Sequence, residues 1–181
     1  MSDTNQMTDK QFDLFQSAVQ WVKDEARTQA KAKRWRKAYK KMQKGVRHYQ
    51  GNWGSGLIKR DGRSVKNGGY QWREVCPSSA CLAGNIVLMN GDTFVSALRN
   101  PAYEELLKRQ EAAEVAVEIT VDYCIPRDST QVYMIEHRAA ELVGIDHQQA
   151  AALFAGGNTA EHVIHNAERV AEAHGRELQL I

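Results

Sequence analysis

The sequence predicts a mainly α-helical fold with a minor β hairpin or strand, and an α+β fold is the alternative. Apolar residues recur at helical spacing near both ends of the chain, whereas only residues 115–123 alternate apolar and polar side chains. A length of 181 residues with a hydrophobic fraction of 43% is enough for one sizeable core. We therefore expect a single domain over residues 1–181, with a basic helical segment at 9–49, a glycine-rich arm at 50–75 and a helical core at 76–181.

The first expected helix follows Asp9, which is a suitable N-cap. Its inner face is predicted by apolar residues at helical spacing, namely Phe12, Phe15, Val19, Val22 and Ala26. A second apolar stripe with a different phase runs from Trp35 to Tyr49, among many Lys and Arg residues. The segment is therefore expected to be one bent helix or two helices.

Six glycines between Gly51 and Gly69 break any regular pattern and predict a loop. Within this stretch, Asp61-Gly62 separates two short apolar segments, and an Asp-Gly pair favours a tight hairpin turn. The hairpin would form an arm. The strand predicted at 115–123 needs a partner, which would be this hairpin or residues 70–75.

Two further helices are expected in the middle of the chain. Ser78 or Ser79 is predicted to cap a buried helix that runs over residues 81–89 and stops at Asn90-Gly91. Asn100 followed by a proline predicts the start of the next helix, which would end near residue 113.

The last third of the chain predicts three helices. Ser129 is expected to cap the first, Asp146 and Gln149 form a capping box for the second, and Asn158 and Glu161 form one for the third. Their inner faces are predicted from apolar residues at helical spacing: Ile135, Ala139, Leu142 and Val143, then Ala150, Leu153 and Phe154, then Val163, Ala167, Val170 and Ala171.

The net charge of +2 conceals a strong asymmetry along the chain. Residues 23–73 hold 16 Lys and Arg against three acidic residues, a net charge of +13, whereas residues 74–181 have a net charge of −9. Such a split indicates nucleic-acid binding, another anionic partner or charge pairing within the protein. This asymmetry is the strongest functional indication in the sequence.

Composition also argues against several classes of protein. The N-terminal residues are polar and lack the positive start and apolar run of a secretory signal. The longest apolar run, residues 86–89, is far too short to cross a bilayer. Three cysteines do not make a disulfide framework. We therefore expect a soluble cytoplasmic protein with reduced thiols and no membrane partner.

Two stretches carry a resemblance to known proteins. Cys76-Pro-Ser-Ser-Ala-Cys81-Leu-Ala-Gly84, and later Gly144-Ile145 followed by Gln149-Ala150 and Leu153-Phe154, resemble a group of small uncharacterised proteins from actinobacteria and their phages. The likeness covers the part of the chain from the first motif onward. It implies a helical, cytoplasmic protein of a kind that phages also encode, and it implies no activity.

The favoured function is non-catalytic binding of a polyanion, with nucleic acid first. Cations cover much of the second expected helix and continue into the arm, where Trp53, Tyr70 and Trp72 are placed to stack on bases. The residues expected to contact nucleic acid are Arg34, Arg36, Lys37, Lys40, Lys41, Lys44, Arg47, Trp53, Lys59, Arg60, Arg63 and Trp72. Because most contacts would be to phosphates, we expect affinity without much sequence preference.

A protein-interaction module is the alternative function. The basic face would then be solvated, or would pair with the acidic half of the same chain or of a second copy, and the partner would be a host protein. A helix-turn-helix is a further hypothesis, because Ala140, Gly144, Ile145 and Ala150 have its spacing. The helix that would read DNA begins at His147 and contains no Lys or Arg, so a plain helical hairpin explains the same residues.

Enzymatic and cofactor-binding hypotheses are weaker. Cys81 lies where a helix N-terminus would activate a thiol, but no local signature nominates a histidine partner, and its neighbours are apolar. Cys76, Cys81 and Cys124 with one histidine, or His162 with His165, lack the usual spacing of zinc ligands. The glycines at 51–56 lack the Gly-Lys-Ser/Thr ending of a phosphate loop. We expect no cofactor and no metal, and the sequence leaves the oligomeric state open.

Overall fold

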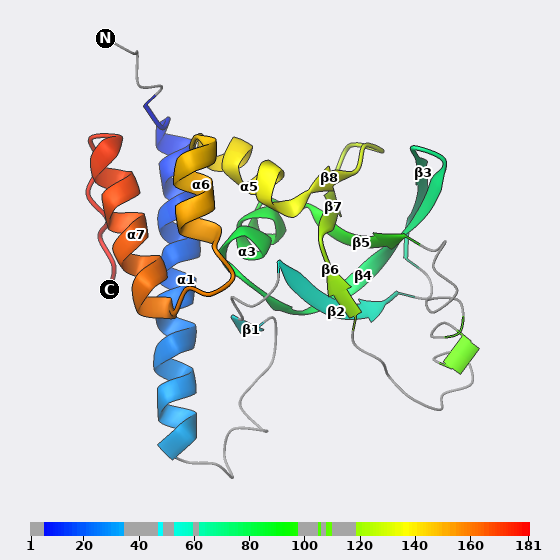
Figure 1. The fold of residues 1–181 in the computed structure, drawn as a ribbon, viewed down its shortest axis with the longest axis horizontal. Helices are drawn as coiled ribbons and strands as arrows, with labels where there is room; N and C mark the ends of the chain where they lie inside the picture. The colour runs from blue at the N-terminus through cyan, green and yellow to red at the C-terminus, as the bar shows by residue number, and fades with distance from the viewer. Residues whose placement is uncertain are drawn as a thin grey trace.

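The computed structural model describes residues 6–34, 47–48, 53–59, 62–97, 105, 108–109 and 119–181. Over these residues the chain has an α+β fold, in which five helices pack beside an eight-stranded sheet (Figure 1). The prediction of a mainly α fold is therefore wrong, and the alternative is the observed class. Most strands were missed because they lack a clean alternation of apolar and polar residues.

The helices and strands follow one another along the chain in a mixed order. Their bounds are α1 (Asp9–Arg34), β1 (Arg47–His48), β2 (Gly54–Ile58), β3 (Ser64–Asn67), β4 (Tyr70–Ala80), α3 (Leu82–Met89), β5 (Thr93–Ala97), β6 (Ile119–Val121), β7 (Tyr123–Ile125), β8 (Tyr133–Met134), α5 (Ile135–Val143), α6 (His147–Phe154) and α7 (Ala160–Ala173). The helices gather on one side of the molecule, and β3 lies at the opposite end of the sheet (Figure 1).

The long strand β4 organises the sheet. Its C-terminal part pairs with β2 and its N-terminal part with β3, so β2 and β3 act as two parts of one interrupted strand antiparallel to β4. β5 pairs antiparallel with the N-terminal part of β4, and the short β1 pairs in parallel with its end.

The sheet is strongly curled. β6 pairs with β2 and β7 pairs with β5, so in a flat sheet of this order they would lie four strand spacings apart, about 19 Å. Asp122 alone separates β6 from β7, and one residue spans at most about 7 Å between its neighbours. The two ends of the sheet must therefore approach each other, which gives a curled half-barrel.

The long helix α1 forms the centre of the helical side and contacts α3, α5 and α7. Its predicted inner face is confirmed for Phe15, Val19 and Val22, which are completely buried. The predicted cap is wrong. Thr8 caps the helix instead of Asp9, because Thr8 Oγ1 accepts the N–H of Gln11 and the Thr8 N–H donates to Gln11 Oε1.

The second expected basic helix falls largely outside the described residues. Residues 35–46 and 49 are not described, and Arg47–His48 form β1 rather than part of a helix. Of the helix expected at 100–113, the structure describes Glu105, Lys108 and Arg109, all three helical. The strand expected at 115–123 is confirmed at Ile119–Val121 and Tyr123, and its first four residues are not described.

The described residues of the glycine-rich stretch, 53–59 and 62–75, lie largely in the sheet and do not form an arm. Residues 54–56 lie in β2, which is buried, and its β6 and β4 neighbours enclose it. The predicted hairpin turn at Asp61-Gly62 is also misplaced, since β2 and β3 both pair with β4 rather than with each other. The turn lies at Gly68-Gly69, where both residues have positive φ angles of 57° and 75°, as a tight turn between twisted strands requires.

The three C-terminal helices are confirmed, together with the capping box of Asp146 and Gln149 on α6. Two predicted caps are wrong. Ser129 lies before β8, and no side chain caps α5. Thr159 caps α7, while the side chain of Asn158 donates to the last carbonyl groups of α6. The cap predicted for α3 is also wrong, because Cys81 caps this helix and Ser78 and Ser79 belong to β4.

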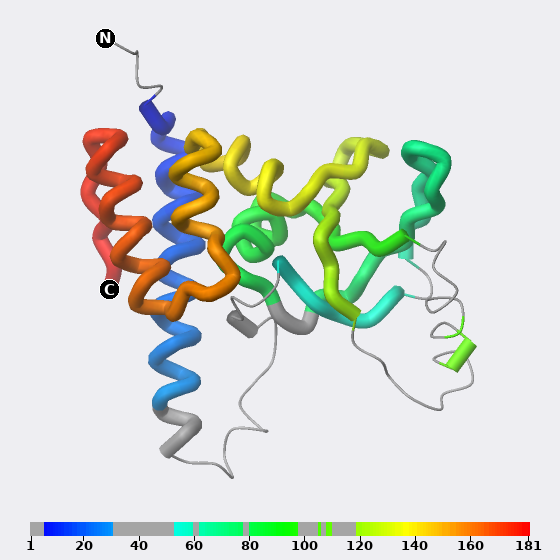
Figure 2. Tube along the Cα trace, viewed as in Figure 1, coloured from blue at the N-terminus to red at the C-terminus, as the bar shows by residue number. Residues whose placement is uncertain are grey.

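After α7 the chain returns alongside α1 in an extended segment (Figure 2). Gln20 holds this segment through both ends of its amide, because Oε1 accepts the N–H of Ile181 and Nε2 donates to the Ile181 carbonyl oxygen. Lys23 donates to the carbonyl oxygen of Leu180. The segment therefore fixes α1 against α7.

The two faces of the sheet have separate cores. Phe94 and Cys124 face the main core, which the helices share, while their neighbours Val95 and Ile125 belong to a small cluster with Trp72. Adjacent strand residues point to opposite faces, so the small cluster marks the face that is turned away from the main core.

Candidate nucleic-acid interface

The structure describes half of the predicted contact residues. Arg36, Lys37, Lys40, Lys41, Lys44 and Arg60 lie outside the described residues. Arg34 ends α1 and Arg47 lies in β1, and only their backbones are described. The side chains of Trp53, Lys59, Arg63 and Trp72 are described, and three of these four lie near one another.

Trp53 is separated from the others. It precedes β2, whose first residue pairs with Ala80 at the end of β4, and it packs against the main core. Trp72 lies near the start of β4. Lys59 and Arg63 lie close to Trp72, because both form ion pairs with Glu74, two residues further along β4.

Three aromatic rings gather on the small-cluster face of the sheet. The ring centroid of Trp72 lies 6.2 Å from that of Tyr70 and 4.8 Å from that of Tyr123, with interplanar angles of 56° and 58°. Tyr70 is 47% exposed and Tyr123 is 36% exposed, whereas Trp72 is only 9% exposed. The tyrosines are therefore the accessible rings, and Trp72 supports them from between.

The register of the sheet explains why these rings meet. Trp72 pairs with Ala97 on β5, and Tyr123 pairs with Val95 on the other side of the same strand. Residues directly opposite in antiparallel strands share a face. Because alanine and valine are small, the two aromatic side chains can lean across β5 and touch. The indole N–H of Trp72 donates to the carbonyl oxygen of Asn67, which fixes the ring.

Two cations, Lys59 and Arg63, lie beside this aromatic group. Lys59 Nζ lies 3.8 Å from Glu74 Oε2, and Arg63 Nε lies 3.5 Å from Glu74 Oε1, so two cations share one carboxylate. Arg63 also donates to the carbonyl oxygen of Arg127 in the turn after β7. Successive side chains of a strand point to opposite faces, so Lys66 and Arg73, the neighbours of Val65 and Trp72, point away from the aromatic rings. We call Lys59, Arg63, Tyr70, Trp72 and Tyr123 the β3–β4 surface.

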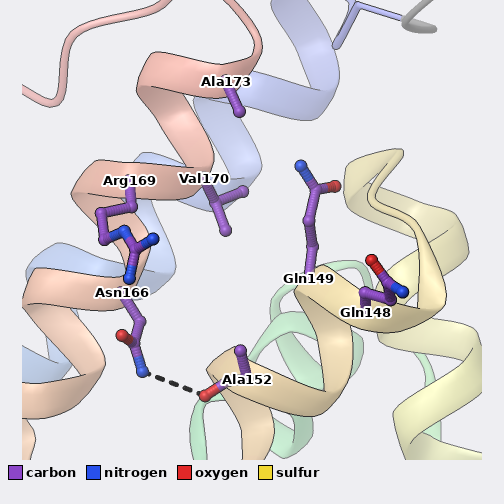
Figure 3. Close-up of a pocket in the computed structure, with 7 residues that line it drawn as sticks. All are labelled: Gln148, Gln149, Ala152, Asn166, Arg169, Val170 and Ala173. Carbon is purple, nitrogen blue, oxygen red and sulfur yellow. Dashed lines mark hydrogen bonds between the residues drawn. The ribbon is translucent and has the colours of Figure 1, made fainter. Parts of the chain in front are cut away.

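A separate cleft of about 290 Å³ lies between α6 and α7 (Figure 3). Gln148 and Gln149 line it from α6, and Asn166 and Arg169 line it from α7. Asn166 closes one end by donating to the carbonyl oxygen of Ala152. α6 does expose His147 and Gln148, as a reading helix would, but the cleft contains only one cation, so it offers little to a phosphate backbone.

Cys81 is placed poorly for catalysis. Its thiol is buried at the start of α3, and Sγ accepts the N–H of Gly84 at 3.4 Å. Desolvation by burial raises the pKa of Cys81 to about 12, against the lowering effect of the backbone hydrogen bonds. Burial likewise raises the pKa of Cys124 to about 12. A neutral buried thiol is a packing residue that also caps the helix, and it is a poor nucleophile.

This chemistry predicts the pattern of thiol alkylation. With iodoacetamide at pH 7.5, we expect rapid labelling of the exposed Cys76, and protection of Cys81 and Cys124 until the protein is unfolded in urea. A pKa of about 12 leaves less than about one thiol in 10⁴ ionised at this pH. Mass spectrometry of tryptic peptides measures each site. Labelling of native Cys81 at the rate of Cys76 would revive the thiol-enzyme hypothesis.

Other classes of site find no support in the described parts of the chain. No group of three or more His, Cys, Asp or Glu residues is placed there to hold a metal ion. No helix among the described residues is long and apolar enough to cross a bilayer. Comparisons with family models, curated proteins and solved structures found no match to the chain. A functional proposal must therefore rest on the geometry of the molecule itself.

Proposed function

We propose that the chain is a non-catalytic, cytoplasmic nucleic-acid-binding protein and that the β3–β4 surface contacts the phosphate backbone. The observation that carries the proposal is the excess of positive charge beside exposed aromatic rings. Residues 59–74 contain five Lys and Arg but only two acidic residues. Exposed tyrosines with a lysine and an arginine beside them are suited to a ligand with both bases and phosphates.

The ion pairs of this surface leave charge available for a ligand. Lys59 is 51% exposed, and its contact with Glu74 is a long one at 3.8 Å. Exposed pairs of this kind contribute only about 0–1 kcal/mol, so a phosphate can compete for the lysine. Arg63 and Lys59 together also outnumber the single carboxylate. The surface therefore keeps a positive potential even with both pairs formed.

The test is a binding experiment with labelled mixed-sequence DNA and RNA across a salt series. We expect the double variant Lys59→Gln/Arg63→Gln to bind about tenfold or more weakly. The slope of log K against log salt should become shallower by about 1.4–1.8, since each lost phosphate contact removes 0.7–0.9. The side chains of Lys59 and Arg63 are 51% and 35% exposed, so we expect the variant to fold, and circular dichroism checks that it does.

A matched variant controls for total charge. Lys10→Gln/Arg169→Gln removes the same two charges from exposed positions on α1 and α7, away from the β3–β4 surface, and should bind like the wild type. Equal weakening in both variants would mean that the contacts lie elsewhere. Absence of binding to every oligonucleotide at low salt would end the proposal.

A further inference from the structure

We propose, on the basis of the nucleic-acid function proposed above, that the β3–β4 surface selects single-stranded nucleic acid and that Tyr70 and Tyr123 are its base-stacking residues. The chemistry that they would recognise is the open face of an unpaired base joined to a phosphodiester backbone. Unpaired bases on a phosphodiester backbone occur in both single-stranded DNA and single-stranded RNA.

The two tyrosine rings are accessible from solvent. Tyr70 and Tyr123 are 47% and 36% exposed on one face of the sheet. Both lie on paired strands and not on loops, because Tyr70 pairs with Asn67 on β3 and Tyr123 pairs with Val95 on β5. An exposed ring on a rigid strand can stack on a base with little loss of conformational entropy.

Trp72 holds the two tyrosine rings in place. Its ring contacts both tyrosine rings, and its indole N–H is already used in a hydrogen bond to Asn67. The tilted rings lie too close together to admit a base between them. Bases would therefore stack on the accessible faces of Tyr70 and Tyr123. Trp72 acts as a positioning residue that holds both rings.

Positive charge lies next to the tyrosine rings. Lys59 and Arg63 lie beside the aromatic group along β4, through their contacts with Glu74. A strand with two bases on the tyrosines would bring its phosphates to these cations. In a duplex the base faces are covered by neighbouring bases, so only the phosphate contacts would remain. Stacking would therefore distinguish single strands from duplex, whereas charge alone would not.

The experiment compares single-stranded and duplex forms of the same mixed-sequence DNA and RNA by fluorescence anisotropy. Tyr70→Ala and Tyr123→Ala should each weaken single-strand binding by about fivefold or more, with an unchanged salt slope and unchanged duplex binding. Tyr70→Phe and Tyr123→Phe keep the ring and should bind like the wild type. Circular dichroism of each variant controls for folding.

The possible outcomes separate this inference from the proposed function. Equal affinity for single strands and duplex, with no effect of either alanine variant, would overturn the stacking inference and leave nucleic-acid binding in place. Absence of binding to any oligonucleotide would overturn both. A preference for RNA over DNA among the single strands would point to contacts with the 2′-hydroxyl group in addition to stacking.

Discussion

Replacing Arg138 with methionine is expected to lower the free energy of unfolding by about 3–5 kcal/mol. Arg138 Nε lies 2.9 Å from Asp92 Oδ2, and the Asp92 side chain is only 1% exposed. The substitution would leave this buried carboxylate with the amide of Asn90 as its remaining side-chain partner among the described residues. An unpaired buried charge is among the most costly defects in a folded protein.

The environment of Arg138 supports this expectation. Burial acts to lower the pKa of Arg138, but the hydrogen bond and the attraction to Asp92 outweigh it, so the pKa is raised above its ordinary value. The guanidinium group also binds Glu141 and lies over the ring of Tyr133. The pair joins the loop between α3 and β5 to α5, which are far apart in the chain.

Urea denaturation of two further variants makes the test specific. Asp92→Asn/Arg138→Met removes both charges and should recover most of the lost stability, because no unpaired charge remains. Asp24→Asn breaks the exposed pair between Asp24 and Arg27, in which both side chains are more than half exposed, and should cost at most about 1 kcal/mol. A loss below 1 kcal/mol for Arg138→Met would contradict the expected role of the pair.

The sequence predicted the helices well, because their signals are local. Phe15, Val19 and Val22 are buried on α1 as their spacing indicates, and Val163, Ala167 and other inner residues of α7 are buried too. The caps were less predictable. Several Ser, Thr, Asp or Asn residues precede each helix, and the one that caps it depends on where the preceding chain is held by other elements.

The sheet could not be predicted from local patterns. β4 contains Arg73, Pro77 and two serines, and β2 contains two glycines, so neither resembles a typical strand. Their stability comes from partners distant in the sequence, since β2 pairs with β6 more than 60 residues later. Pairing over such distances leaves no periodic signal in a short window of sequence.

The candidate site was predicted in part. The concentration of charge and the tryptophan pointed to Lys59, Arg63 and Trp72, which the sheet brings together. Tyr123 was missed as a stacking residue, because only the pairing of β7 with β5 places it beside Trp72. Conversely, Trp53 looked equivalent to Trp72 in sequence but lies beside the opposite end of β4.

Replacing Gly84 with alanine is expected to destabilise the protein by about 3 kcal/mol or more. Helix propensity alone predicts the opposite sign, because alanine is favoured over glycine by about 1 kcal/mol inside a helix. At Gly84, however, an added Cβ would lie 2.0 Å from the carbonyl oxygen of Trp53 and 3.1 Å from the ring of Phe94. The oxygen belongs to the backbone and accepts the N–H of Cys81, so it cannot move without displacing α3 from β2.

Thermal unfolding measures this difference, with Gly157→Ala as the matched control. Gly157 lies in the turn between α6 and α7, its φ is outside the left-handed region, and its Cβ position has open space around it. We expect Gly84→Ala to lower Tm by at least about 6 °C and Gly157→Ala to change it by no more than about 4 °C. A neutral or stabilising effect of Gly84→Ala would show that α3 and β2 are not in close contact. In the structure, Cys81 caps α3 and Gly84 allows its close approach to Trp53, so both residues of the Cys76–Gly84 motif have structural roles. A neutral effect would remove the physical reason for a glycine at the end of that motif.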